Sequence, residues 1–145
     1  MTESQWNKEI VLECFRCLRD QDLERLLMYM HADMVLEVPG KRFGGKFKGA
    51  AGGRDFFENF HSIVAPWLNP SRSSKTETIL TEGNAVFAST IERGSLTNGE
   101  QWETRLFWLF KFDGRKVLSL SFSFDTEGFE DLLTEPGSSD GEAVA

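Results

Sequence analysis

Long apolar runs are missing from this chain of 145 residues. A membrane-spanning helix needs about 20 consecutive, mostly apolar residues, and no such stretch occurs, so we predict no membrane partner. The first residues, MTESQWNKE, are polar and lack the apolar core of a secretory signal. Both absences lead us to expect a cytoplasmic protein in a reducing environment.

A surplus of basic residues is also missing. The formal net charge is −7, and residues 126–145 hold six acidic residues but no Lys or Arg. The rest of the chain is close to neutral, so no basic face would neutralise phosphates, and we predict no nucleic-acid partner. We expect residues 1–133 to form a single α+β barrel domain. Residues 134–145 have little apolar content and are expected to be a disordered acidic tail.

Cysteine and histidine are scarce, with two of each. Cys14 and Cys17 form a CxxC motif, but there is no second cysteine pair, and His31 and His61 do not stand at the spacing of metal ligands. The cysteines share the apolar stripe of the first expected helix with Trp6, Ile10 and Leu18. We therefore interpret them as small buried side chains, and we predict neither a metal nor a cofactor.

The motifs of common catalytic and nucleotide-binding sites are absent as well. There is no GxSxG, no Ser-His-Asp order and no carboxylate-rich metal cluster. Residues 40–47, GKRFGGKF, approach a phosphate-binding loop, but Phe47 stands where that loop needs Ser or Thr. We interpret them as a flexible pocket lip within a glycine-rich loop over residues 40–53. Any catalysis must then come from isolated polar groups in an apolar cavity.

Aromatic residues, in contrast, are abundant, with 13 Phe and 4 Trp. They favour an aromatic-rich core or pocket. In the last third of the chain, two apolar strands meet at an Asp-Gly turn at residues 113–114, a strong hairpin signal. On the second strand, Leu118, Leu120, Phe122 and Phe124 alternate with small or charged residues. Period-2 alternation predicts that these four side chains share one face.

The pattern along the chain predicts three helices followed mostly by strands. The helices are expected over residues 4–19, 23–30 and 54–66, and the strands over residues 34–38, 75–81, 85–96, 101–112 and 116–125. Segregated helices and strands predict the α+β class. We expect a cone-shaped, curved, antiparallel (mixed) sheet wrapped around the helices. The last four strands should form a meander against the third helix.

This order is similar to that of the nuclear transport factor 2-like superfamily, in its SnoaL-like polyketide-cyclase branch, over about residues 11–133. The segments that carry the resemblance are RDQDLERLL (19–27), HADMV (31–35), GAAGGRDFFENF (49–60), and FKFDG (110–114) through FD (124–125). The resemblance implies a cystatin-like or ketosteroid-isomerase-like architecture. Enzymes of the family include ketosteroid isomerases, polyketide cyclases and limonene-epoxide hydrolases, and many members have no known chemistry.

The functional positions of these relatives can be compared with the chain one at a time. By this resemblance, the oxyanion tyrosine of the isomerases falls near Cys14, and their general base falls on Val38. The acid on the last strand falls on Phe122, and the Arg and Asp of the epoxide hydrolases fall on Thr90 and Glu92. Only Glu92 keeps the chemistry. The chain therefore resembles the family's scaffold more than its known mechanisms.

Glu92 is the candidate general acid or base, with His61 as its partner. If its strand face points inward, burial near aromatic side chains raises the pKa of Glu92. The alternatives are an exposed Glu92 beside Arg93 and a purely structural His61 at the edge of a helical stripe. The expected ligand-binding lining consists of Thr90, Trp102, Leu106, Trp108, Phe122, Phe124, Phe56, Phe60 and Trp67.

Two main functions remain open at this point, and a third hypothesis is a protein–protein adaptor that uses the acidic tail. One is an isomerase, cyclase or hydrolase that acts on a polyketide- or terpenoid-like substrate by acid–base chemistry. The other is a non-catalytic module, on the same scaffold, for ligand binding or dimeric interaction. Either would hold a small apolar molecule. The strand over residues 101–112 is apolar on both faces, and a strand buried on both sides needs two partners, so we also expect a homodimer.

Overall fold

The computed structural model describes residues 1–41, 44–65 and 68–124. Trp67 of the expected lining and the expected tail, residues 134–145, lie outside the described residues. In chain order the elements are α1 (Glu3–Asp20), α2 (Leu23–Met28), β1 (Met30–Val38), β2 (Gly45–Lys48), α3 (Gly49–Val64), β3 (Leu68–Glu82), β4 (Ala85–Leu96), β5 (Gln101–Asp113) and β6 (Lys116–Ser123).

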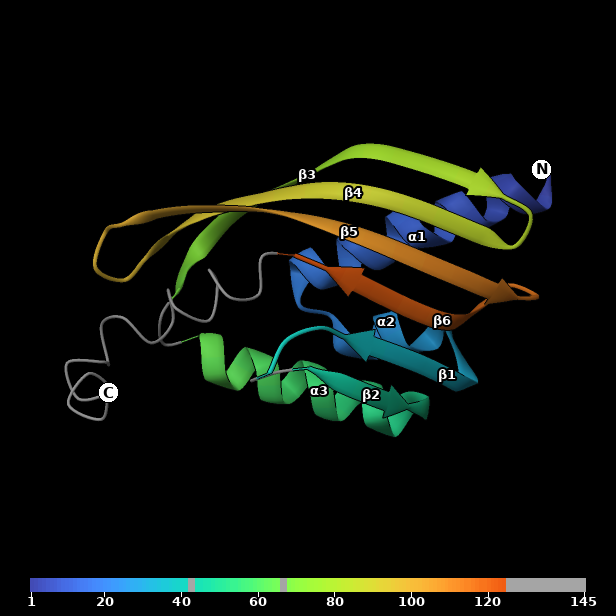
Figure 1. Cartoon of the computed structure of the whole chain (residues 1–145), viewed down its shortest axis with the longest axis horizontal. Helices are drawn as coiled ribbons and strands as arrows, with labels where there is room; N and C mark the ends of the chain where they lie inside the picture. Colours follow the sequence, from blue (N-terminus) through green and yellow to red (C-terminus); the bar gives the residue numbers. More distant parts are fainter. Residues whose placement is uncertain (42–43, 66–67, 125–145) are drawn as a thin grey trace.

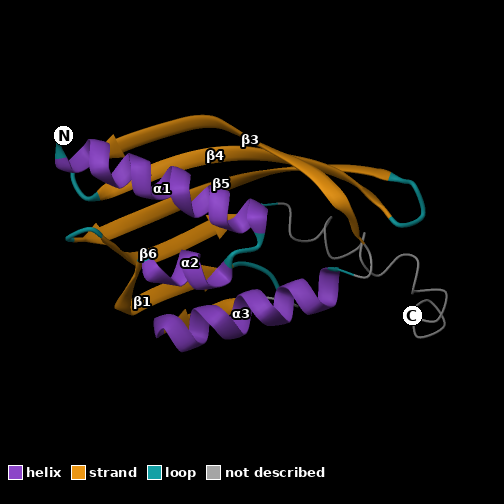
Figure 2. Cartoon of the chain, turned by 180° about the vertical axis from the view of Figure 1, so that it is seen from behind, coloured by secondary structure: helices purple, strands orange, loops and turns teal. Residues whose placement is uncertain are grey.

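The six strands form one curved, mixed sheet in the order β2-β1-β6-β5-β4-β3 (Figure 1). β1 and β6 run parallel, and all other neighbours are antiparallel. All three helices lie on the same face of the sheet, which we call the inner face (Figure 2). The α+β class and the mixed sheet are confirmed. The expected barrel is corrected to an open sheet, because among the described strands β2 and β3 are unpaired edges.

Local sequence explains where α1 begins and ends. The Thr2 hydroxyl accepts a hydrogen bond from the Gln5 backbone N–H (3.2 Å), and the Gln5 side chain accepts one from the Thr2 N–H (2.7 Å). This capping box satisfies backbone donors at the start of the helix. Gln21 ends it with a left-handed backbone (φ 56°). The buried residues of the helix are Asn7, Ile10, Val11, Cys14 and Cys17. Trp6 is therefore not part of the buried stripe, and its side chain is 37% exposed.

The core lies between the helices and the inner face. On α1, the Phe15 ring lies 5.2 Å from the ring of Trp108, on β5. On α3, the Phe56 ring lies 5.1 Å from that of Phe47 on β2 and 6.3 Å from that of Phe122 on β6. The third helix thus packs mainly against β1 and β2, whereas α1 lies along β3 and β4. This corrects the expectation that the meander packs against the third helix. None of the described helices is long and apolar enough to cross a membrane.

The glycine-rich loop expected over residues 40–53 is also corrected. It contains β2, which pairs antiparallel with β1, and the start of α3 at Gly49. Glycine has a low propensity for both strands and helices, so tertiary packing outweighs local propensity in this segment. At Gly53, a Cβ would lie 3.1 Å from the Met34 Cε atom, so a larger residue would require this methyl group to shift. The glycine lets α3 approach β1 closely.

A β-bulge interrupts the strict alternation expected on β6. Lys111 pairs with Ser119, whereas Phe112 pairs with Val117, so Leu118 is the extra residue. Val117 is fully buried, and Leu118 is 36% exposed. Period-2 alternation predicts that Leu118 shares the inner face with Leu120. This prediction is wrong, because the one inserted residue moves the Leu118 side chain to the other face.

Candidate functional site

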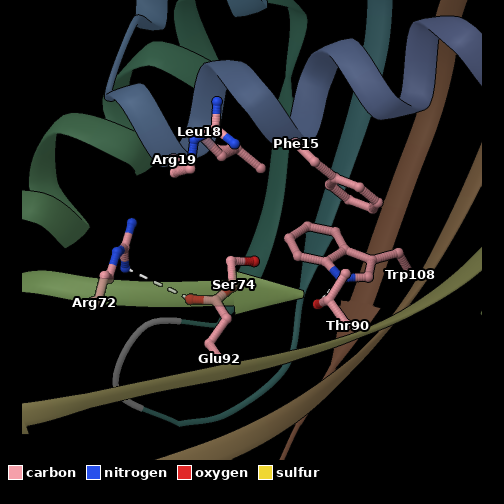
Figure 3. Close-up of a pocket in the computed structure, with 8 residues that line it drawn as sticks. All are labelled: Phe15, Leu18, Arg19, Arg72, Ser74, Thr90, Glu92 and Trp108. Carbon is pink, nitrogen blue, oxygen red and sulfur yellow. Dashed lines mark hydrogen bonds and ion pairs between the residues drawn. The ribbon is translucent and has the colours of Figure 1, made fainter. Parts of the chain in front are cut away.

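A pocket lies between the C-terminal end of α1 and the inner face of the sheet (Figure 3). Its enclosed part has a volume of about 20 Å³, and its free space is about 360 Å³ when the mouth open to solvent is included. The enclosed part has room for about one water molecule. The lining residues are Phe15, Leu18, Arg19, Arg72, Ser74, Thr90, Glu92 and Trp108.

Glu92 lies on the inner face of β4, opposite Ser74 on β3 and Thr104 on β5. Its side chain is 20% exposed, and its Oε1 atom lies 3.6 Å from Nη1 of Arg72 (Figure 3). Burial raises the pKa of the Glu92 carboxyl, and the positive charge of Arg72 opposes this rise without cancelling it. Glu92 is therefore a carboxyl group that holds its proton more strongly than an ordinary glutamate does.

Trp108 lines the pocket with an aromatic ring and is joined by a hydrogen bond to Thr90, which also lines the pocket. The Trp108 Nε1–H donates to Oγ1 of Thr90 over 2.9 Å, and both residues are buried. The Trp108 ring also lies 5.1 Å from the ring of Phe122, in addition to its contact with Phe15. The hydrogen bond and the two ring contacts fix the orientation of the indole. Trp108 is thus a rigid surface next to the Glu92 carboxyl.

A second row of residues crosses the inner face beside Glu92. Arg72 pairs with Gly94, which pairs with Trp102. A Cβ at Gly94 would lie 2.9 Å from Nε1 of Trp102, so the indole lies directly over the glycine. The Trp102 Nε1 atom is buried and has no hydrogen-bond partner among the described residues. We call the set Arg72, Ser74, Glu92, Gly94, Trp102 and Thr104 the polar end of the inner face.

The structure brings together only some of the expected site residues. Glu92, Thr90 and Trp108 line the same pocket. Leu106 belongs to the core, and the aromatic residues Phe56, Phe60, Phe122 and Phe124 pack against one another or against the core. These rings fill space in which the sequence had predicted a roomy aromatic cavity. Ring stacking brings more favourable contact than an empty cavity would, because voids forfeit dispersion contacts.

His61 is not brought to Glu92. It is exposed on α3, and it is not among the residues that line the pocket. The helix carrying it packs over β1 and β2, whereas Glu92 lies on β4, near the far edge of the sheet. Among the family positions, Cys14 is fully buried, and burial raises the pKa of its thiol. Cys14 is therefore a weak acid in the core.

Sequence reasoning missed Arg72, which is the ion-pair partner of Glu92. The strand was expected to begin at residue 75, but β3 begins at Leu68. The alternation Arg72-Ser74-Thr76, continued backward from that strand, was the available signal. It is weak, because Pro70 and three serines over residues 71–74 are typical of a turn. Within the described residues, no group of three or more His, Cys, Asp or Glu side chains could hold a metal ion.

The structure is an open α+β sheet with helices on one face and a carboxyl-containing pocket between α1 and the sheet. The model of the SnoaL-like domain matches residues 11–120, and the chain belongs to this family within the nuclear transport factor 2-like superfamily. No curated protein matches the sequence significantly.

Solved structures show the same fold at low identity. A nuclear transport factor 2-like protein of unknown function from Burkholderia pseudomallei K96243 is 17% identical, with a TM-score of 0.77 over 92% of this chain and 99% of that one. TerC, co-crystallised with polyporic acid, is 22% identical, with a TM-score of 0.75 over 88% and 98%. A protein from Jannaschia sp. CCS1, provisionally assigned as a SnoaL-like polyketide cyclase, is 14% identical, with a TM-score of 0.69 over 92% and 95%.

Proposed function

We propose that this protein is an acid–base enzyme that acts on a small, largely apolar molecule, with Glu92 as the proton donor or acceptor. The observation that carries this proposal is the position of Glu92 in the pocket, next to Trp108 and Thr90. General acid–base catalysis requires a titratable group within reach of the substrate and with a pKa near the working pH. Burial moves the pKa of Glu92 in that direction.

The reaction class follows from what one carboxyl group can do. A single acid or base moves a proton to or from a carbon next to a carbonyl group, or to an oxygen, and isomerisation, cyclisation and hydrolysis all begin with such a step. Phe15 and Trp108 offer aromatic surface to a planar or cyclic substrate. A polyketide- or terpenoid-like substrate suits this surface. Its bulk would occupy the open mouth, because the enclosed part holds only about 20 Å³.

The small enclosed volume favours a second candidate, a binding or interaction module without catalysis. Ligand pockets usually measure about 300–1,000 Å³, and the cavity of this pocket, about 20 Å³, is far below that range. The family positions outside Glu92 hold Cys14, Val38 and Phe122, which are poor proton donors or acceptors. A protein that only holds its ligand needs none of them.

We further propose that the protein acts as a homodimer joined through the outer face of the sheet. On that face the Phe87 and Phe107 rings stack at 6.2 Å, and both are more than a third exposed. The exposed apolar residues of this face include Leu80, Phe87, Phe107, Leu109 and Leu118. A second copy of the chain would cover them, as expected for an apolar patch of this kind.

Proton exchange in heavy water tests the catalytic proposal without a known substrate. We expect the protein to speed deuterium incorporation next to the carbonyl group of cyclic ketones such as 2-tetralone, followed by NMR. Glu92→Gln keeps the shape and removes the titrating group, so the rate should fall about 10²–10⁴-fold. Glu103→Gln on the outer face is the matched control and should keep the rate. Binding of the ketones without any exchange would favour the binding module instead.

His61→Gln separates the two candidate catalytic residues. Because His61 is exposed and does not line the pocket, its substitution should change the exchange rate less than twofold. A loss as large as that of Glu92→Gln would show that His61 takes part in proton transfer after all.

A further inference from the structure

The Trp102 indole N–H is a hydrogen-bond donor that contacts no acceptor in the described part of the chain. Its Nε1 atom is buried and has no partner among the described residues. Buried donors in folded proteins are nearly always paired, so each exception calls for an explanation. The indole lies against Gly94, where a Cβ would come within 2.9 Å of Nε1. Because residue 94 is a glycine, the Trp102 N–H can lie close to the backbone of β4.

Arg72 is a second donor in the same row of the sheet. It stands in the same row, on the other side of Gly94 from Trp102. Its pair with Glu92 is long, at 3.6 Å, and its side chain is 31% exposed. By contrast, the Arg105 guanidinium on the outer face donates to both oxygens of Glu77, at 2.8 and 3.2 Å. Arg72 thus has unused donor capacity at the pocket mouth, because a guanidinium carries five N–H groups.

We propose that Arg72 and the Trp102 Nε1–H form a donor pair for an anionic oxygen of the ligand, a carboxylate or an acidic enol. This inference rests on the proposed function only in placing the ligand at the Glu92 pocket. The apolar body of the ligand lies toward Phe15 and Trp108, and its anionic oxygen lies between Arg72 and the Trp102 Nε1–H, beside the residues that line the pocket. The ligand oxygen draws Arg72 away from Glu92. The Glu92 carboxyl then faces the ligand without its ion-pair partner.

The tryptophan side chains themselves report on this proposal. In an ¹⁵N-labelled protein each of the four indole N–H groups gives its own signal. Titration with 2-naphthoate should move the Trp102 signal downfield, since a carboxylate acceptor forms a strong hydrogen bond. The neutral analogue 2-naphthamide should move it much less. The Trp6 signal is an internal reference, because Trp6 lies on the exposed side of α1 and does not line this pocket.

Variants assign the effect to the two donors. Trp102→Phe keeps a flat ring over Gly94 but loses the N–H, and Arg72→Gln loses the charge. Each should weaken naphthoate binding at least tenfold and change naphthamide binding less than threefold. Trp6→Phe, on the exposed side of α1, and Arg93→Gln, on the outer face, are matched controls and should bind as the unmutated protein does.

The outcomes separate this inference from the proposed function. Equal affinity for naphthoate and naphthamide, or an unmoved Trp102 signal at saturation, would overturn the anion assignment even if Glu92→Gln abolishes proton exchange. No binding of either compound at millimolar concentration would overturn it too. If the donor pair discriminates as expected while Glu92→Gln keeps full exchange, the anion site stands and the catalytic role of Glu92 fails. The experiment on the unmutated protein holds even if one variant does not fold.

Discussion

The two ends of the β4–β5 hairpin differ on both faces of the sheet. At one end, which we call the packed end, Val86, Ala88, Phe110 and Trp108 are buried beneath α1. At the polar end, the same two strands carry Glu92, Thr104 and Trp102. Trp102 Nε1 has no partner within the described residues, and Glu92 forms a long ion pair with Arg72 on β3. The outer face follows the same division, with stacked Phe87 and Phe107 beside the packed end.

This difference separates stability from function within one pair of strands. The packed end supplies buried apolar surface and stacked rings, which hold the sheet against α1. The polar end retains groups that cost free energy when they are buried without partners. A protein can retain such unpaired polar groups where a bound ligand forms the missing hydrogen bonds. The four predictions below test whether the two ends are as different as this comparison implies, from the largest expected effect to the smallest.

Removing a ring from the packed end should have the largest effect. Phe110 is fully buried on the inner face of β5, so Phe110→Ala should lower the free energy of unfolding by about 3–5 kcal/mol. Urea denaturation measures this loss. Phe107→Ala, three residues earlier on the outer face, should cost about 1 kcal/mol or less at concentrations where the chain is monomeric. Equal losses would contradict the contrast between the two faces.

The hydrogen bond at the boundary between the two ends should have an intermediate effect. Thr90→Val leaves the buried Trp108 Nε1–H without its acceptor, and this should cost about 1–3 kcal/mol. Thr90→Ser keeps the hydroxyl and should recover part of the loss. Thr78→Val, at an exposed position on β3, is the control. If Thr90→Val and Thr78→Val lower the free energy of unfolding by the same amount, the hydrogen bond does not hold Trp108 in place.

The apolar patch outside the packed end should drive self-association. Phe107→Asp places a charge in the middle of the proposed dimer interface, and its dimer dissociation constant should rise at least about tenfold, or about 1.4 kcal/mol. Light scattering at several concentrations measures it. Arg105→Glu, farther along the outer face, should weaken self-association if the interface extends past the Phe107 side chain. An unmutated protein that stays monomeric at micromolar concentration would sink the dimer proposal.

The smallest expected effect is a dependence of stability on pH at the polar end. Burial raises the pKa of Glu92, so the folded protein keeps this proton to higher pH than the unfolded chain does. The resulting stabilisation is complete below the unfolded pKa, about 4.3, and is lost as the pH rises through the folded value. The Glu92→Gln variant has no carboxyl group to titrate at position 92, so it does not lose this stabilisation. Its free energy of unfolding relative to that of the unmutated protein should therefore rise from about pH 4 toward neutral pH. Denaturation at several pH values checks the sign, and a falling difference would show that Arg72 outweighs burial.

Much of the fold could be predicted because it follows from local patterns. The faces of β5 follow from period 2, and Trp108 and Phe110 are buried as that pattern predicts. The placement of Glu92 and Thr90 on the same face of their strand follows from the same rule. The pattern failed at Leu118, where a bulge inserts a residue, and over residues 40–53, where glycines conceal an edge strand and the start of a helix.

The candidate site was less predictable than the fold. Arg72 could not be assigned to Glu92 because their contact depends on the register of β3 against β4, which includes an irregularity between Thr76 and Thr78. His61 was expected beside Glu92, but the position of its helix over β1 and β2 keeps it away. Neither outcome can be inferred from the residues that are close to Glu92 or His61 in the sequence. Both depend on which distant segments meet.

The sequence by itself determined the α+β class, the family scaffold and the faces of the meander strands, including the face that Glu92 shares with Thr90. These follow from backbone periodicity and turn chemistry, which act over a few residues. Only the tertiary structure decided that the aromatic rings fill the expected cavity, that Arg72 lies beside Glu92 and that the Trp102 N–H lies buried over Gly94. The physical reason is that packing and register depend on contacts between strands and helices far apart in the chain, where a shift of one residue changes every neighbour.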